Sequence, residues 1–275
     1  MNKKQLIMEK SIELFANQGI KKTSVQQITE YCGISKGAFY LSFKSKDELI
    51  LAIIDHFMQQ ITADIDHVVR TNHTKDILYQ IFHKIFKAFL QHRDLAKFLM
   101  IEQNHSLNKE LLTRMQYYHK IADKTFLEML ERIYGESINE IKYDLIYAIK
   151  GLINGYADIV IFNNGKLDLD LIATSLVEKV DILAKNITTP FITLETGEMF
   201  QDFLIEEISK EKLISMIDTS LKEIEESIEK ESLVTLKQHL IEPSYNRAII
   251  NGLIENIRNH PDCKWLSYLL RRYIR

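Results

Sequence analysis

The sequence predicts an all-α fold, and three observations support this prediction. All three prolines lie after residue 189, so the first 189 residues can form uninterrupted helices. Apolar residues recur at helical spacing, as Ile81, Ile85 and Phe89 do. The chain before Pro190 shows no convincing stretch of the alternating pattern that is typical of strands.

Glycines, prolines and polar clusters divide the chain into candidate helices. The predicted ranges are 3–18, 24–32, 35–42, 46–70, 75–92, 94–103, 107–134 (which could be broken), 138–163, 168–186, 198–208, 210–229, 231–240, 244–259 and 262–274. The segment 187–197 is the one β-like piece, and a linker explains it equally well.

Composition excludes several classes of protein. A hydrophobic content of 46% can supply a sizeable core. Charges interrupt the apolar runs, so we expect no membrane span, no signal peptide and a cytoplasmic location. Cys32 and Cys263 lie far apart in sequence and indicate neither a disulfide framework nor a zinc site. Hydrolase, dinucleotide and nucleotide motifs are absent and the histidines lack metal spacing, so we expect neither catalysis nor a metal or cofactor.

Charge is distributed unevenly along the chain. Residues 1–46 contain eight lysines and three glutamates, a net charge of +5, whereas the whole chain carries only −3. This asymmetry suggests that the N-terminal segment meets a polyanion. A solvated lysine surface is the simpler alternative.

The segment SVQQITEYCGISKGAFYLSF, which begins at Ser24, predicts two short helices joined by a tight turn. Ser24 and Gln27 have the spacing of a capping box, with Val25, Ile28 and Cys32 inward. Gly33 stands where the chain must leave the helix with a positive φ. Ser35 is placed to cap the second helix. This pattern is that of a helix-turn-helix, whose second helix fits the DNA major groove, although a plain helical hairpin is the alternative.

The second short helix has an outward face suited to a groove. Phe39 is expected to turn inward, which leaves an outward set: Lys36, Gly37, Ala38, Tyr40 and Leu41. Gly37 and Ala38 permit close approach, and Lys36 can reach a phosphate or a guanine edge. A second capping box, Ser45 to Glu48, would open the next helix and point Lys46 toward the DNA backbone.

From about Lys3 to Leu51 the chain resembles the DNA-binding domain of TetR-type (tetracycline-repressor family) transcriptional regulators. The resemblance rests on LFANQG, TSVQQIT, CGISKGAFY and FKSKDEL, without gaps. It implies an all-helical dimer in which a three-helix DNA-binding domain (1–46) joins an effector-binding and dimerisation domain (47–189). Residues 190–275 exceed the family's common length, and their amphipathic pattern predicts an additional helical subdomain. By position, it assigns DNA contacts to Ser24, Gln27, Ser35, Lys36, Ala38, Tyr40, Leu41 and Lys46.

Two residues depart from the family's usual pattern. Thr29 replaces a common alanine, which its small size makes tolerable. Leu41 stands where Tyr, His or Asn is common, so a polar contact is lost, although leucine can touch a thymine methyl.

The range 138–186 reads as two helices around a turn at 163–165, and it is the expected dimer interface. The first of these helices is apolar on several sides, and Gly151 and Gly155 form a small-residue notch. By resemblance to the family, the partner is the same pair of helices in a second subunit. Burial against the C-terminal extension is the alternative.

Aromatic residues are abundant between about 75 and 160, and most of them are expected to fill a core. The family resemblance adds a pocket for a small apolar or aromatic effector. Candidate effector contacts are Phe86, Glu102, Asn104, His105, Tyr118 and Tyr147. Effector binding would then tilt the helix that begins near Lys46 and release DNA.

The expected function is therefore a ligand-responsive transcriptional repressor that binds a palindromic operator. Activation stays open, because the sign depends on where the operator lies. A DNA-binding architectural protein without an effector is the alternative. At the C-terminus Arg271, Arg272 and Arg275 could touch nucleic acid or a membrane, but a frayed basic terminus is favoured.

Overall fold

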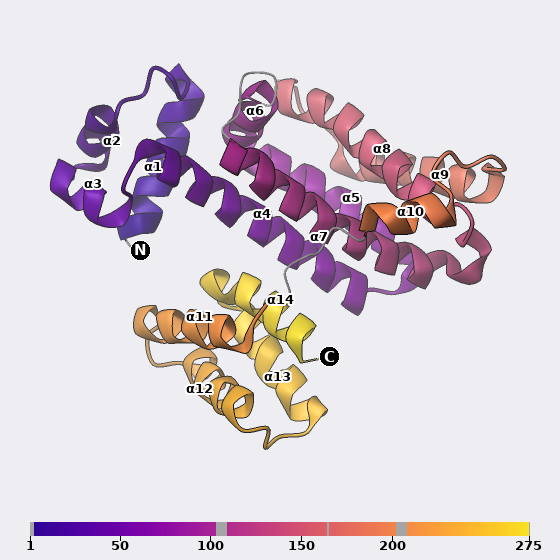
Figure 1. Cartoon of the computed structure of the whole chain (residues 1–275). Coiled ribbons are helices and arrows are strands. Elements are labelled where there is room, and N and C mark those ends of the chain that lie inside the picture. The colour runs from indigo at the N-terminus through magenta and orange to yellow at the C-terminus, as the bar shows by residue number, and fades with distance from the viewer. Residues whose placement is uncertain (1–2, 103–108, 164, 202–207, 275) are drawn as a thin grey trace. The chain divides into compact units, whose positions relative to one another are not determined.

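The computed structural model describes residues 3–102, 109–163, 165–201 and 208–274, and these residues are helical with no strand (Figure 1). The helices are α1 (Lys3–Gln18), α2 (Val25–Cys32), α3 (Lys36–Ser42), α4 (Lys46–Thr71), α5 (Thr74–Gln91), α6 (Arg93–Glu102), α7 (Lys109–Tyr134), α8 (Lys142–Phe162), α9 (Leu169–Asn186), α10 (Leu194–Gln201), α11 (Lys210–Glu223), α12 (Ile228–Ile241), α13 (Arg247–Arg258) and α14 (Lys264–Tyr273). Short 3₁₀ turns, η1 (Gly135–Ile138) and η2 (Pro261–Cys263), precede α8 and α14. The all-α prediction is confirmed.

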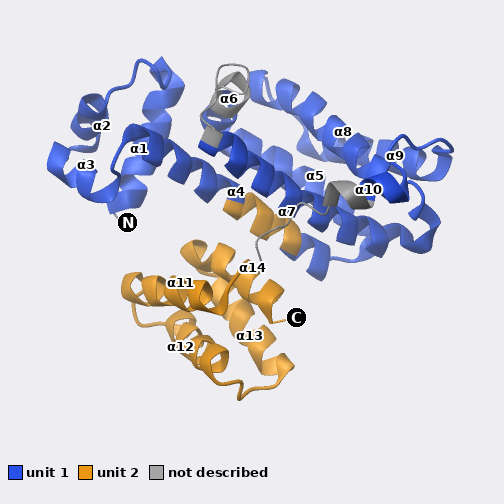
Figure 2. Ribbon diagram, viewed as in Figure 1, with its two compact units in different colours: residues 1–58, 67–203 blue, residues 59–66, 204–275 orange. Residues whose placement is uncertain are grey.

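The chain forms two compact units (Figure 2). Unit 1 contains residues 1–58 and 67–203, and unit 2 contains residues 204–275 together with 59–66. Helix α4 is therefore divided: its two ends belong to unit 1 and its middle segment belongs to unit 2.

The N-terminal part of unit 1 is a bundle of α1, α2 and α3. All three helices contact one another, and α1 also packs against α6. Ile7, Ile28 and Phe39 are completely buried at the centre of the bundle. A few large side chains thus hold short helices that would not be stable alone.

The rest of unit 1 is organised around α5. This helix packs against α7, α8 and α9, and its buried face includes Ile81, Phe82 and Phe86. Helix α4 joins α7 through a smaller buried cluster of Leu51, Ile54 and Leu111. The body is therefore an apolar helical bundle, as the 3.6-residue spacing predicts.

Unit 2 has a core of its own. Helix α12 packs on α11 and α13, and α14 packs on α11 and α13. Leu213, Leu236, Ile254 and Leu270 are buried at these contacts. The C-terminal segment is thus a separate helical unit that incorporates one stretch of α4.

Several predicted boundaries are corrected. Helix α7 is continuous over residues 109–134, and the predicted helix 138–163 begins only at Lys142, after η1. The predicted helix 210–229 ends at Glu223, because Ser227 caps a new helix at Ile228. The β-like segment 187–197 is not a strand: it connects α9 to α10, which begins at Leu194.

The basic C-terminus is not frayed as favoured from the sequence. Arg271 forms an ion pair with Glu255 at 2.8 Å. The side chain of Arg272 is 11% exposed, and its guanidinium lies 3.9 Å from the Asp66 carboxylate and over the Tyr268 ring. Both side chains are structural parts of unit 2, and Arg275 lies outside the described residues.

Gly197 of α10 should be intolerant of any side chain, because a Cβ there would overlap the Tyr143 ring of α8. We expect Gly197→Ala to destabilise the protein by about 1–3 kcal/mol, the usual cost of overpacking. Thermal unfolding followed by circular dichroism measures this loss. Gly252→Ala in α13 is the matched control, since its Cβ meets no atom within 4 Å and alanine favours the helix. Equal melting of the two variants would contradict the proposed contact.

Candidate DNA-binding interface

The turn between α2 and α3 is built from local capping bonds. The Ser24 hydroxyl accepts from the Gln27 backbone N–H at 3.2 Å, and Gln27 Oε1 accepts from the Ser24 N–H at 2.8 Å. This is the predicted capping box, which contributes about 1 kcal/mol. Gly33 ends α2 with a φ of 66°, in the left-handed region that glycine adopts without strain.

The buried side of α2 differs slightly from the prediction. Ile28 is buried as expected, but Thr29 accompanies it, while Val25 and Cys32 are only partly buried. The Thr29 hydroxyl donates to the Gln26 carbonyl at 2.8 Å. Threonine is therefore accommodated at this position because its polar atom is satisfied within the helix.

Helix α3 presents the outward face that the sequence predicts. The Ser35 hydroxyl caps it by accepting from the Ala38 N–H at 3.2 Å. Phe39 is fully buried, whereas Tyr40 is 53% exposed and Leu41 is 90% exposed. Lys36 and Gly37 are exposed as well. Leu41 is thus almost fully exposed on a helix of seven residues, about two turns long.

Lys46 was expected to face DNA, but its ammonium is engaged inside the protein. Lys46 Nζ donates to the carbonyl oxygens of Ile20 and Thr23, each at 3.0 Å. These carbonyls belong to the turn between α1 and α2. The two bonds tie the first turn of α4 to the helix-turn-helix, and a DNA contact of Lys46 stays a prediction.

Capping at the start of α4 also differs from the predicted box. The Ser45 hydroxyl accepts from the Glu48 N–H at 3.0 Å, as predicted. The Glu48 carboxylate, however, accepts from the Lys44 N–H at 2.6 Å instead of the Ser45 N–H. Glu48 thus fixes the backbone of Lys44, whose own side chain is exposed between α3 and α4.

Lys44 is one of the exposed basic residues that the sequence-based set of DNA contacts left out. Lys21 and Lys22, in the turn after α1, are exposed too. The signal that could have identified all three is the +5 charge of the first 46 residues. Exposed lysines in loops beside a reading helix are suited to phosphates, which position a protein on DNA without selecting a sequence.

Comparison with known proteins is consistent with this interface. Residues 7–53 match the family described as bacterial regulatory proteins, tetR family. The chain is 29% identical to the uncharacterized HTH-type transcriptional regulator YerO of Bacillus subtilis, over 94% of this chain and 91% of YerO. It is 26% identical to the uncharacterized HTH-type transcriptional regulator YuxN of the same organism, over 98% of both chains.

The N-terminal domain is that of a TetR-type transcriptional regulator. A solved structure of FadR from Bacillus subtilis in complex with stearoyl-CoA shares the fold, with a TM-score of 0.54 and 23% identity. The match covers 100% of that FadR chain but only 67% of this one. About a third of this chain thus has no counterpart in FadR, whereas YerO and YuxN match it over nearly their whole length.

The effector candidates of the helical body do not all lie together. Phe86 is buried in α5 and Tyr118 is buried in α7. Tyr147 is 48% exposed on α8 and does not line the interior, so the structure separates it from the other two. Glu102 ends α6, and Asn104 and His105 lie outside the described residues.

A polar cluster that sequence analysis missed lies between α4 and α7. The Tyr118 hydroxyl donates to Asp55 Oδ1 at 3.0 Å, and Arg114 forms an ion pair with the same carboxylate. Burial raises the pKa of the Asp55 carboxyl above its ordinary value, although Arg114 and Tyr118 act in the opposite direction. The ionised carboxylate is thus incompletely compensated. No local sequence pattern pairs residues 55 and 114.

Replacing the two lysines around Ser45 separates a positioning role from a phosphate contact. Lys46→Met keeps the apolar stem but removes both bonds to the turn, so we expect a loss of about 1–3 kcal/mol of stability. Lys44→Met should leave the melting temperature unchanged and reduce the salt dependence of DNA binding by about one unit of slope. The DNA is a labelled duplex identified by enriching host genomic fragments on the protein, called here the selected duplex.

Circular dichroism melts and fluorescence anisotropy titrations over a range of salt concentrations measure the two effects. If Lys46→Met kept its melting temperature and lost about one unit of salt slope, its ammonium would be a phosphate contact after all.

Proposed function

We propose that this protein is a cytoplasmic, homodimeric repressor that binds a palindromic operator and is released by a small apolar or aromatic effector. The observation that carries the proposal is the outward face of α3. Lys36, Gly37, Tyr40 and Leu41 are exposed on one short helix whose opposite side is anchored by the buried Phe39. Small, hydroxyl-bearing and cationic side chains on such a helix suit the major groove.

Homodimerisation is supported by an apolar face on α8. Tyr147, Gly151, Gly155, Ile159 and Phe162 recur at intervals of three or four residues, and all are exposed. Among the described helices, α8 alone is long and apolar enough to cross a membrane, yet only 33% of its most apolar window is buried. Leu171 and Ile182 add exposed apolar surface on α9.

A second copy of this chain is the occupant that we propose for the α8 face. A Cβ at Gly151 or Gly155 would meet no atom within 4 Å, so the two glycines leave a smooth strip where another helix can approach closely. A two-fold dimer then places two reading helices at the spacing of a palindromic site. Tyr147 belongs to this proposed interface and not to an effector pocket.

The effector is proposed to bind within the helices of the body, near α4, α5 and α7. Phe86 and Tyr118 offer aromatic surface, and Arg114 with Tyr118 supplies polar anchors. The FadR chain that shares this fold was solved with stearoyl-CoA, which carries an apolar acyl chain. That likeness supports an apolar effector without identifying it.

Release would proceed through α4. An effector that displaced Arg114 or Tyr118 from Asp55 would change the contact between α4 and α7. Helix α4 begins at Lys46, which holds the turn of the helix-turn-helix. A ligand qualifies as inducer only if it binds the free protein more tightly than the DNA-bound protein. Equal affinity for both forms would exclude it.

Substitutions on α3 test the reading helix. We expect Lys36→Ala and Tyr40→Ala each to weaken binding to the selected duplex by about 1–3 kcal/mol, because each removes a groove or phosphate contact, while thermal stability stays unchanged. Anisotropy titration and circular dichroism measure the two quantities. Tyr273→Ala, at an exposed tyrosine of α14, is the matched control and should bind normally.

Unchanged affinity in both α3 variants would refute the assignment of α3 as the reading helix. Random DNA of equal length decides between a regulator and an architectural protein. A regulator should prefer the selected duplex by roughly 10³-fold or more. A much smaller ratio with steep salt dependence would favour the architectural alternative.

A charge placed in the α8 strip tests the dimer. We expect Gly155→Glu to turn the protein into monomers, because taking a carboxylate out of water against an apolar helix costs several kcal/mol. Sedimentation equilibrium measures the mass in solution. Gly252→Glu, at an equally open glycine of α13, should leave the dimer intact. If the Gly155 variant also remained dimeric, the interface would have to lie elsewhere.

A further inference from the structure

The middle segment of α4, residues 59–66, belongs to the same compact unit as α11–α14 (Figure 2). The rest of α4 belongs to unit 1. A helix that starts at the DNA-binding domain therefore contributes about two of its turns to the C-terminal unit. This sharing is unrelated to any residue that the proposed function uses.

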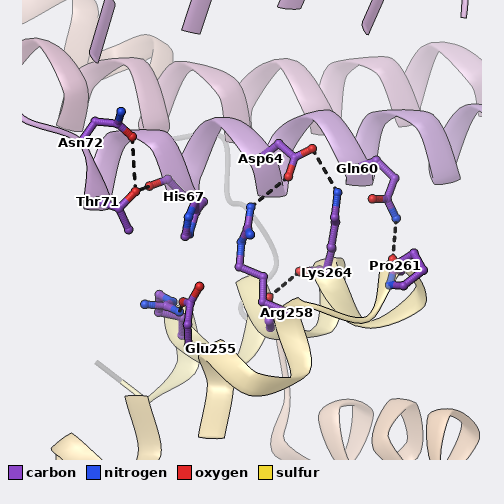
Figure 3. A network of polar contacts seen from close by, with 11 residues as sticks. Gln60, Asp64, His67, Thr71, Asn72, Glu255, Arg258, Pro261 and Lys264 are labelled. Carbon is purple, nitrogen blue, oxygen red and sulfur yellow. Dashed lines mark hydrogen bonds and ion pairs between the residues drawn. The ribbon is translucent and has the colours of Figure 1, made fainter. Parts of the chain in front are cut away.

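Asp64 is the centre of the contact between this segment and the C-terminal helices (Figure 3). Its Oδ1 accepts from Arg258 Nη2 at 3.0 Å, and its Oδ2 accepts from Lys264 Nζ at 3.3 Å. One helical turn earlier, Gln60 Nε2 donates to the Pro261 carbonyl at 2.9 Å. Both polar residues of α4 thus face the segment from the end of α13 to the start of α14.

The charges of this contact are partly withdrawn from solvent. The side chain of Asp64 is 29% exposed, and those of Arg258 and Lys264 are 16% and 27% exposed. Ion pairs in such surroundings are screened less than surface pairs, and each oxygen of the carboxylate has its own cation. Two residues further on, the buried Asp66 lies 3.9 Å from the guanidinium of Arg272. The contact is therefore an extended electrostatic one.

The side chains of Asp55 and Asp64 project from opposite sides of α4, because the nine residues from one to the other amount to about two and a half turns of helix. Asp55 is bound from α7, and Asp64 is bound from α13 and α14. At its first residue α4 is also attached through Lys46. Any tilt or rotation of α4 must consequently change the geometry at Asp64 as well as at Asp55.

We propose that the C-terminal unit is a regulatory clamp on α4, which restrains this helix through Asp64 and thereby raises operator affinity. The inference rests on the operator binding proposed above. A restrained α4 reduces the number of orientations that each reading helix can adopt, and preorganisation of this kind strengthens binding. When this restraint is lost, α4 adopts more orientations, and only a fraction of these orientations allows the protein to bind DNA.

The test compares three changes in the full-length protein. Asp64→Asn removes the charge with almost no change of shape, the double variant Arg258→Gln with Lys264→Gln removes both cations, and the triple variant combines them. We expect each to weaken binding to the selected duplex by about fivefold or more, the lower end of typical coupling between sites. The triple variant should be no weaker than the double, because all three residues form one network.

Hydrogen exchange supplies an independent readout. Amides of residues 59–66 should exchange faster in the Asp64 variant, while those of α2 and α3 should be unchanged. Asp218→Asn is the matched control: it breaks an ion pair of 2.5 Å with Lys237, between α11 and α12, without touching α4. This control should change neither duplex affinity nor exchange in 59–66. Lys264→Gln alone gives a milder loosening if the other variants fold poorly.

Unchanged or tighter duplex binding by the folded Asp64 and Lys264 variants would overturn the clamp, and so would an equal loss in Asp218→Asn. These outcomes are separate from a failure of the proposed function. If the wild-type protein itself bound no duplex specifically, the operator proposal would fall first. Wild-type binding together with indifference to Asp64 would refute the clamp alone.

Discussion

The rigidity of α4 is the constraint on which the rest of the structure depends. Its 26 residues form one uninterrupted α-helix from Lys46 to Thr71, and the sequence places no glycine or proline within them. Sharp kinks in helices arise mainly at proline, at glycine or where a group inserts into the backbone bonds, so we expect α4 to move largely as one piece. Every contact along it therefore bears on the position of its first turn, where Lys46 holds the helix-turn-helix.

Local features of the reading head could be predicted because their causes are local. The bond between Ser24 and Gln27 joins residues three apart, and Gly33 adopts its positive φ where a helix must end. The inward turn of Phe39 follows from helical periodicity. The same reasoning placed the break between α11 and α12 several residues too late, since residues 222–231 contain no glycine or proline to mark it. Only Ser227, as a cap, gave a signal there.

Contacts between distant residues could not be predicted from one sequence. Lys46 has the position of a phosphate contact, and only the fold reveals that two carbonyls 26 and 23 residues earlier take its ammonium. Asp64 meets partners 194 and 200 residues later in the chain. The same holds for Arg272, whose position at a basic terminus suggested fraying while the fold places it near Asp66. In each case the residue type indicated a polar or charged contact, but the sequence did not indicate which residue would be the partner.

The three attachments of α4 differ in chemistry, so they respond to different influences. Lys46 binds neutral carbonyls, a contact that salt weakens little. Asp55 lies where burial disfavours its charge, which makes its contact with Arg114 and Tyr118 sensitive to a ligand that enters the body. Asp64 depends on two partly exposed cations and is the attachment most open to ionic conditions or to a partner of unit 2. Under the proposed mechanism, a single helix held in this way combines several inputs without a separate relay, because each input acts on the helix that leads into the DNA-binding domain.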